Sequence, residues 1–215
     1  MPKLFIICGH GEGDPGAIAF GYTEAERVRT LANRIKEFGG DNVIIGDPNK
    51  NWYKNKLVNN TNIPKGSLVC ELHMDSWTSS GARGGHVVID ADFEPDSYDK
   101  ALADFIQGVL PGRAKIIEKR NNLFNLNRAQ TLGINYRLLE CGFISNAHDL
   151  SIFNEKIDYI AKGILKVFGI EVIEKVQESG KLYRVQVGAF ANKENAEKLK
   201  HELEIRGYKA IIKED

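Results

Sequence analysis

Two histidines and two glutamates are spaced so that they could share one site: His10, Glu24, His73 and Glu140. Each lies at or just beyond the end of an apolar segment, or at the start of the helix expected to follow one. Two imidazoles and one carboxylate are a common ligand set for a catalytic zinc ion, with a fourth position left for water. The second carboxylate would then take a proton from that water.

Each of these four residues also has an ordinary structural role. His10 could be a hydrogen-bonded turn residue, and Glu24 would complement the dipole of the helix that it opens. His73 has acidic neighbours on both sides, which are rival ligands. Glu140 is the least ordinary, because a carboxylate that closes a buried strand is costly without a partner. The residues alone therefore leave a metal site and separate structural roles both open.

The apolar pattern predicts the elements that would position this set. Strands are expected over residues 3–8, 42–46, 67–73, 85–90 and 136–141, and helices over 23–38, 97–109 and 147–167. Thr23 is expected to cap the first helix, with Glu26 as its capping-box partner. Strands that alternate with helices predict an α/β fold with a twisted, mostly parallel sheet and helices on both faces. The carboxyl ends of such strands meet at one edge, where ligands bind.

The turn after the first strand is rich in glycine and allows two interpretations. It reads Gly9-His10-Gly11-Glu12-Gly13-Asp14-Pro15-Gly16-Ala17. As a Gly-x-Gly-x-x-Gly motif, with Asp47 in the ribose-binding place, it indicates a dinucleotide-binding oxidoreductase. Against that interpretation, Pro15 and the non-helical residues up to Tyr22 delay the helix that should hold the pyrophosphate. The oxidoreductase alternative also leaves Glu140 without a role.

Composition places the chain among ordinary globular proteins. Lys plus Arg and Asp plus Glu number 29 each, so the formal net charge is zero, and no basic tract predicts nucleic-acid binding. No signal peptide and no membrane-spanning run are recognisable, so we expect a protein made in the cytoplasm without membrane insertion. Cys8, Cys70 and Cys141 are expected to be core residues, with a thiol metal site as the alternative.

Four motifs, in order, carry a resemblance to one enzyme family. They are the glycine-rich turn, Gly21-Tyr22-Thr23-Glu24, Glu71-Leu72-His73-Met74-Asp75-Ser76 and Leu139-Glu140-Cys141-Gly142-Phe143-Ile144-Ser145-Asn146. Over residues 3–168 the chain resembles the zinc-dependent N-acetylmuramoyl-L-alanine amidases of type 3, found in phage endolysins and sporulation hydrolases. The resemblance implies that His10, Glu24 and His73 bind zinc and that Glu140 is the catalytic base and acid.

The same resemblance implies the substrate, which is the amide between N-acetylmuramic acid and L-alanine in peptidoglycan. The chain departs from the family at Glu12, where Gly is usual, and at Asp75-Ser76, where Asn-Ala is usual. Candidate substrate-binding residues are His86, Asn127 and Arg128, with a hydrogen-bonded strand histidine and a solvated loop as alternatives. A non-catalytic peptidoglycan-binding protein is the alternative for the whole chain. A lytic enzyme without a leader would reach the wall through a pore or on cell lysis.

The composition changes after residue 169, where we expect the catalytic domain, residues 1–169, to end. Residues 170–181 are expected to be a linker, and residues 182–215 a small βαβ unit. This unit resembles half of a SPOR (sporulation-related repeat) domain, a family that binds peptidoglycan glycan strands. The hypothesis is that two chains pair their halves in one sheet and form a homodimer, with a loosely ordered tail as the alternative.

Overall fold

The computed structural model describes residues 2–60, 63–78, 81–174, 185–206, 208 and 210–214. Contacts divide the chain into two units, Met1–Lys175 and Val176–Asp215. The first unit holds a six-stranded sheet in the order β4-β1-β5-β8-β6-β7. Its strands are β1 Leu4–Cys8, β4 Val43–Ile45, β5 Leu68–Asp75, β6 His86–Asp90, β7 Ile117–Arg120 and β8 Asn135–Phe143. Strand β6 runs antiparallel to β8 and the other paired neighbours are parallel, so the mostly parallel sheet is confirmed.

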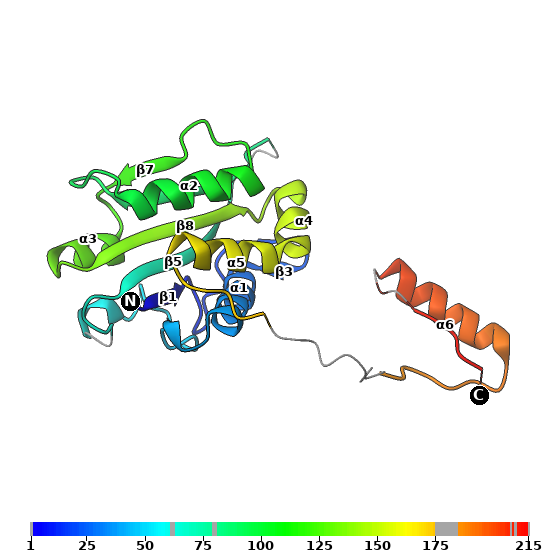
Figure 1. Cartoon of the computed structure of the whole chain (residues 1–215). Helices are drawn as coiled ribbons and strands as arrows, with labels where there is room; N and C mark the ends of the chain where they lie inside the picture. Colours follow the sequence, from blue (N-terminus) through cyan, green and yellow to red (C-terminus); the bar gives the residue numbers. More distant parts are fainter. Residues whose placement is uncertain are drawn as a thin grey trace. The chain divides into compact units, whose positions relative to one another are not determined.

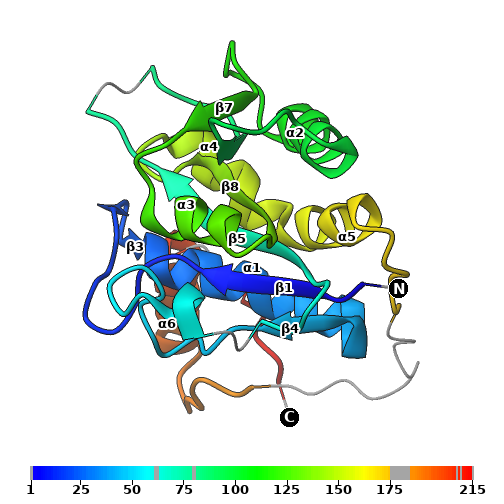
Figure 2. The ribbon, with the colours of Figure 1, turned by 90° about the vertical axis from the view of Figure 1, so that its left-hand side faces the viewer.

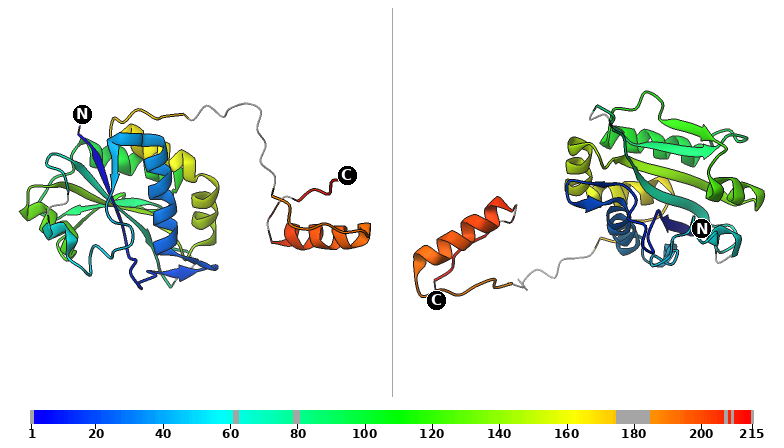
Figure 3. Two further views of the ribbon diagram at one scale, coloured as in Figure 1. Left: turned by 90° about the horizontal axis from the view of Figure 1, so that it is seen from below. Right: turned by 180° about the vertical axis from the view of Figure 1, so that it is seen from behind.

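Helices cover both faces of this sheet, as predicted (Figure 1). The larger core lies under α1 Glu24–Gly39, α2 Ser97–Val109, α4 Ala147–Glu155 and α5 Ile157–Val167. The opposite face carries α3 Phe124–Thr131 and the 3-10 turn Leu57–Asn60. Figure 2 shows α3 and α1 on opposite sides of the strands, and the left view of Figure 3 shows the twist of the sheet. None of the described helices has the length and apolar character needed to cross a membrane.

The structure differs from the predicted elements in four places. The helix expected over 147–167 is two helices, because the backbone leaves the helical conformation at Lys156. A two-stranded hairpin, β2 Ile18–Ala19 with β3 Tyr22–Thr23, precedes α1. A short 3-10 turn, Gly40–Asn42, follows α1. The polar segment expected to be a loop before β8 contains the helix α3.

Alternation along the strands decides which side chains can meet. Leu72 and Leu139 pack into the larger core, so their neighbours His73 and Glu140 point to the face that carries α3. The three cysteines pack into the larger core, on the face away from His73 and Glu140, and all are buried and free. Burial raises the pKa of Cys8 to about 11 and that of Cys70 to about 12. The core role of the cysteines is therefore supported, and a thiol metal site is not.

The second unit contains one helix among its described residues, α6 Lys193–Ile205, capped by Asn192. The two strands of the expected βαβ unit are not formed by the described residues 185–190, 208 and 210–214. Residues 182–184, 207 and 209 lie outside the described part. A strand needs a hydrogen-bonded neighbour, and a two-stranded unit of this size is marginal by itself. The unit leaves apolar side chains in solvent, with Val185 89% and Ile211 78% exposed.

Candidate metal and catalytic site

The glycine-rich turn after β1 makes room for the predicted ligands. A Cβ on Gly9 would lie 2.4 Å from the His73 ring, and one on Gly16 would lie 2.7 Å from Glu24 Oε2. His10 itself has φ 59°, a left-handed conformation that histidine adopts more readily than most residues. Its place in such a tight turn fits a functional constraint on the side chain. The glycines thus allow close packing around two side chains of the predicted site.

Glu24 occupies the first position of α1 and is held there by backbone donors. Thr23 caps the helix by accepting a hydrogen bond from the Glu26 amide at 3.2 Å. The Glu24 carboxylate accepts hydrogen bonds from the Met74 amide at 3.1 Å and the Ala17 amide at 3.2 Å. The side chain is 5% exposed, so its orientation is fixed in a nearly dry environment.

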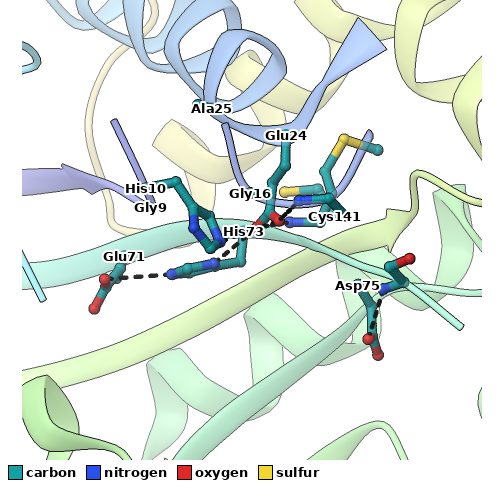
Figure 4. A network of polar contacts seen from close by, with 12 residues as sticks. Gly9, His10, Gly16, Glu24, Ala25, Glu71, His73, Asp75 and Cys141 are labelled. Carbon is teal, nitrogen blue, oxygen red and sulfur yellow. Dashed lines mark hydrogen bonds and ion pairs between the residues drawn. The ribbon is translucent and has the colours of Figure 1, made fainter. Parts of the chain in front are cut away.

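His10, Glu24 and His73 come together as one cluster (Figure 4). His10 Nε2 lies 3.1 Å from Glu24 Oε2, and His73 Nδ1 lies 2.8 Å from Glu24 Oε1. One nitrogen or oxygen atom of each residue lies within 4.8 Å of those of the other two. Two imidazoles and a carboxylate at this separation have the composition of a catalytic zinc site.

The charges in this cluster favour the ionised carboxylate of Glu24 and the protonated forms of the two imidazoles. Burial would raise the pKa of Glu24, but its hydrogen bonds with His10 and His73 lower that pKa far below its usual range. Burial lowers the pKa of His73, and hydrogen bonds with Glu24 and Glu71 outweigh it, so the pKa rises well above its usual value. A cation placed among these groups would take the place of those protons.

Glu140 lies beside this cluster in the sheet. It is the register partner of His73 on β5 and of His86 on β6, so the three side chains form a row across one face. Glu140 Oε2 is buried and has no hydrogen-bond partner among the described residues. Burial is the main cause that raises the pKa of Glu140, to about 8, and the nearby Glu24 and Asp75 carboxylates add to it. Such a carboxyl is suited to exchange a proton near neutral pH.

The three predicted substrate-binding residues each have a polar contact within the protein. His86 is buried on β6, and its Nε2 lies 3.5 Å from an Arg113 nitrogen. Asn127 and Arg128 lie on α3 rather than on a loop, and they hydrogen-bond with the Asn121 carbonyl and with Asn59. The structure does not test whether they bind substrate, so this role stays a prediction.

The two departures from the resembled family pattern both have partners. Glu12 stands at φ 52°, where glycine is favoured, and its carboxylate contacts Lys50 at 2.9 Å and the Asn55 amide. Asp75 is half-buried and lies 4.0 Å from Arg113. The negative charge that these residues add near the cluster is therefore partly compensated by cations.

The geometry of the turn does not favour the dinucleotide alternative. The β2–β3 hairpin separates the glycines from α1, which begins only at Glu24. The Gly16 amide donates a hydrogen bond to the Asp14 carboxylate at 2.9 Å, so this amide is not free to bind a phosphate. The N-terminus of α1 lies against the turn, but its Glu24 and Ala25 amides donate to the Ala17 and Pro15 carbonyls at 2.9 and 3.0 Å and are therefore not free for a pyrophosphate.

The sequence prediction missed the residues that contact the outer sides of the two imidazoles. Asp14 lies beside His10, and Glu71, noted only as a rival ligand, lies beside His73. Glu71 could have been found from its spacing, because residues two apart on a strand share a face. Asn51 and Asn125, which contact these carboxylates, are far from them in sequence and gave no local signal.

Comparisons with known proteins identify the families that the chain matches. Residues 4–169 match the family described as N-acetylmuramoyl-L-alanine amidase, and residues 161–214 match the family described as SPOR domain. The chain is 31% identical over 179 residues to the "Probable autolysin PH" of Staphylococcus aureus, covering 74% of this chain and 37% of that protein. It is 25% identical to the "Sporulation-specific N-acetylmuramoyl-L-alanine amidase" of Bacillus subtilis, covering 99% of this chain and 84% of that protein.

Solved structures share the fold of the first unit. The CwlD amidase from Clostridioides difficile, solved with the GerS lipoprotein, aligns with a TM-score of 0.61 at 20% identity, covering 78% of this chain and 98% of that one. The catalytic domain of the CD27L endolysin targeting Clostridia difficile aligns with a TM-score of 0.63 at 20% identity, covering 80% and 100%.

Proposed function

The chain belongs to the N-acetylmuramoyl-L-alanine amidase family, and on that premise we propose that it hydrolyses the amide between N-acetylmuramic acid and L-alanine in peptidoglycan. In this proposal zinc is held by His10, Glu24 and His73, and Glu140 transfers the protons. The observation that supports it most is Glu140 Oε2, which is buried beside the three-residue cluster and has no hydrogen-bond partner within the described part of the chain.

The donor set of the site fits zinc. Two imidazole nitrogens and a carboxylate suit zinc, and in catalytic sites three protein ligands leave a position open. The pKa of Glu24 is held low, so its carboxylate is ready to bind a cation. When bound, zinc would act as a Lewis acid toward the amide carbonyl and make a water molecule more acidic.

The residues of this chain would carry the proton through the reaction. Glu140 takes a proton from the attacking water at its carboxylate and gives it to the amide nitrogen as the C–N bond breaks, because an amine leaves poorly unless it is protonated. Glu24, fixed by the Met74 and Ala17 amides, contacts both imidazoles, whose rings pack edge to face with centroids 5.1 Å apart. The products are a free lactyl carboxylate on the sugar and a free amino group on L-alanine.

Activity after metal removal tests this proposal. Purified protein is incubated with peptidoglycan, and release of muramyl peptides is followed before chelation, after chelation and after zinc is restored. We expect release to stop on chelation and to return with zinc. Release that persists in the chelated protein would contradict the zinc role. A total absence of release under all three conditions would favour the non-catalytic wall-binding alternative.

We also propose that the second unit binds the wall and pairs two chains. Its match to the SPOR family supports contact with peptidoglycan. Val185, Val187 and Ile211 are exposed apolar side chains that a second copy of the unit could cover. Pairing would provide the neighbour that the expected strands lack within one chain. Release of the protein to the wall through a pore or on lysis also remains part of this proposal.

A further inference from the structure

Both imidazoles of the candidate zinc site are held from their outer side as well as from Glu24. His10 Nδ1 lies 2.9 Å from Asp14 Oδ2, while its Nε2 faces Glu24. His73 Nε2 lies 3.3 Å from Glu71 Oε1, while its Nδ1 faces Glu24 (Figure 4). Each ring is therefore placed between two carboxylates, one shared and one its own.

Each outer carboxylate is in turn held by an asparagine amide from another element. Asn51, in the loop after β4, donates from Nδ2 to Asp14 Oδ2 at 3.0 Å. Asn125, on α3, donates from Nδ2 to the two Glu71 oxygens at 3.1 and 3.2 Å. Both asparagines are 3% exposed, and the Glu71 side chain is 4% exposed, so the hydrogen bonds between Asn125 and Glu71 are shielded from water.

These contacts fix where each neutral ring carries its hydrogen. A carboxylate only accepts hydrogen bonds, so in the metal-free protein both nitrogens of each ring face an acceptor, which favours the doubly protonated ring. A zinc ion beside Glu24 would displace the hydrogens of His10 Nε2 and His73 Nδ1, and the hydrogens that face Asp14 and Glu71 would stay. Zinc requires such an unprotonated ring nitrogen as its ligand.

We propose that the pairs Asp14–Asn51 and Glu71–Asn125 are positioning residues that hold His10 and His73 in opposite tautomers for zinc. His10 carries its hydrogen on Nδ1 and binds through Nε2, whereas His73 carries it on Nε2 and binds through Nδ1. This inference rests on the zinc site of the proposed function. Asp14 and Glu71 contact the imidazoles, and Asn51 and Asn125 contact Asp14 and Glu71, so all four residues would act through the metal site.

The Asp14–Asn51 and Glu71–Asn125 pairs differ in burial, and this difference predicts unequal contributions to zinc affinity. The Glu71 side chain is 4% exposed, whereas that of Asp14 is 43% exposed. A hydrogen bond to a charged group is worth more where water and salt do not screen it. The Glu71–Asn125 pair should therefore contribute more to zinc affinity than the Asp14–Asn51 pair.

The direct test is the tautomer of each ring in the full-length, zinc-loaded protein. Histidine labelled with ¹⁵N gives long-range ¹⁵N–¹H correlations that distinguish the two neutral tautomers. We expect hydrogen on Nδ1 of His10 and on Nε2 of His73. Equal tautomers in the two rings, or the reverse assignment, would overturn the proposal without any variant having to fold.

Zinc affinity of variants provides the second readout, measured by competition with a chelator. Glu71→Gln and Asn125→Ala should weaken zinc binding by about 10–100-fold, and Asp14→Asn should weaken it less. Gln130→Ala, on the same helix as Asn125 but in contact with Asp92, is the control and should leave affinity unchanged. Thermal unfolding in chelator checks that each variant folds. Unchanged zinc affinity in folded Glu71→Gln and Asn125→Ala would overturn the proposal.

The proposed function is tested separately on the same samples. Peptidoglycan digestion by the wild-type protein is measured beside the tautomers. Opposite tautomers without digestion would contradict the amidase proposal and leave the positioning roles standing. Digestion by a protein whose two rings have equal tautomers would support the amidase proposal and contradict the positioning roles.

Discussion

Glu140 combines a buried oxygen that lacks a partner among the described residues with a place next to the His10, Glu24 and His73 cluster. Glutamine has the same shape but cannot take up and return a proton. We expect Glu140→Gln to bind zinc as the wild-type protein does and to lose about 10²–10⁴-fold in rate. Clearing of a cell-wall suspension measures the rate, and elemental analysis measures the zinc. Clearing at the wild-type rate would contradict the catalytic role.

The protonation of His73 predicts how zinc binding depends on pH. Burial lowers the pKa of His73, but its hydrogen bonds with Glu24 and Glu71 raise it well above its usual value in the metal-free protein. The stability from this proton is fully present below the unfolded pKa of about 6.5 and is lost as pH rises through the folded pKa. Zinc must displace the proton, so it binds better at higher pH.

The increase in Tm that zinc produces should therefore be larger at pH 8 than at pH 6. Thermal unfolding with chelator and with zinc at the two pH values measures this difference. An increase that stays constant or shrinks toward pH 8 would show that His73 carries no displaceable proton.

At the scale of elements, the close approach of β1 and β5 places the His73 ring against Gly9. A Cβ at Gly9 would lie 2.4 Å from His73 Cε1, so Gly9→Ala must displace the ring. We expect zinc affinity to fall by about tenfold or more, since outer changes that misplace a ligand cost this much. Chelator competition measures it.

Gly108→Ala is the matched control for this substitution. Gly108 lies within α2, and a Cβ there would meet no atom within 4 Å. Alanine should raise helix stability by about 0.5–1 kcal/mol and leave zinc affinity unchanged. Equal zinc affinity in Gly9→Ala and Gly108→Ala would show that the ring position does not depend on this contact.

The elements that were predictable from sequence are those with strong apolar periodicity. The β1, β5 and β8 segments each contain a short apolar stretch, and the α1 helix has both a cap and an apolar face, so their positions follow from local signals. The α3 helix is short, begins after Leu123 without a side-chain cap and is rich in polar residues. Its buried Asn125 faces Glu71 only because of tertiary packing, which no local pattern encodes.

The same reasoning explains what could be predicted of the site. Glu24 opens a helix, and His10, His73 and Glu140 lie near the carboxyl ends of strands, where the topology of a parallel sheet gathers side chains. The asparagines that hold the outer carboxylates come from elements far away in the sequence. Their contribution depends on register and helix placement, so it became visible only in the structure.

At the scale of the whole molecule, the chain consists of an enzyme-like unit and a small unit with an exposed apolar surface. Val185 and Val187 are 89% and 65% exposed, which is unfavourable for a unit that stays alone. We expect sedimentation velocity at micromolar concentration to show a dimer, and Val187→Glu to shift it toward monomer. A wild-type protein that sediments only as a monomer would contradict the pairing of the second units.

The central claim is that this chain cuts the bond between N-acetylmuramic acid and L-alanine with a zinc site built on His10, Glu24 and His73. The most direct measurement is mass spectrometry of defined peptidoglycan digested by the purified protein, before and after zinc removal. The account predicts new free lactyl carboxylates on the glycan and peptides that begin with free L-alanine, both absent after zinc removal. New reducing sugar ends, or peptides cut at another bond, would contradict it.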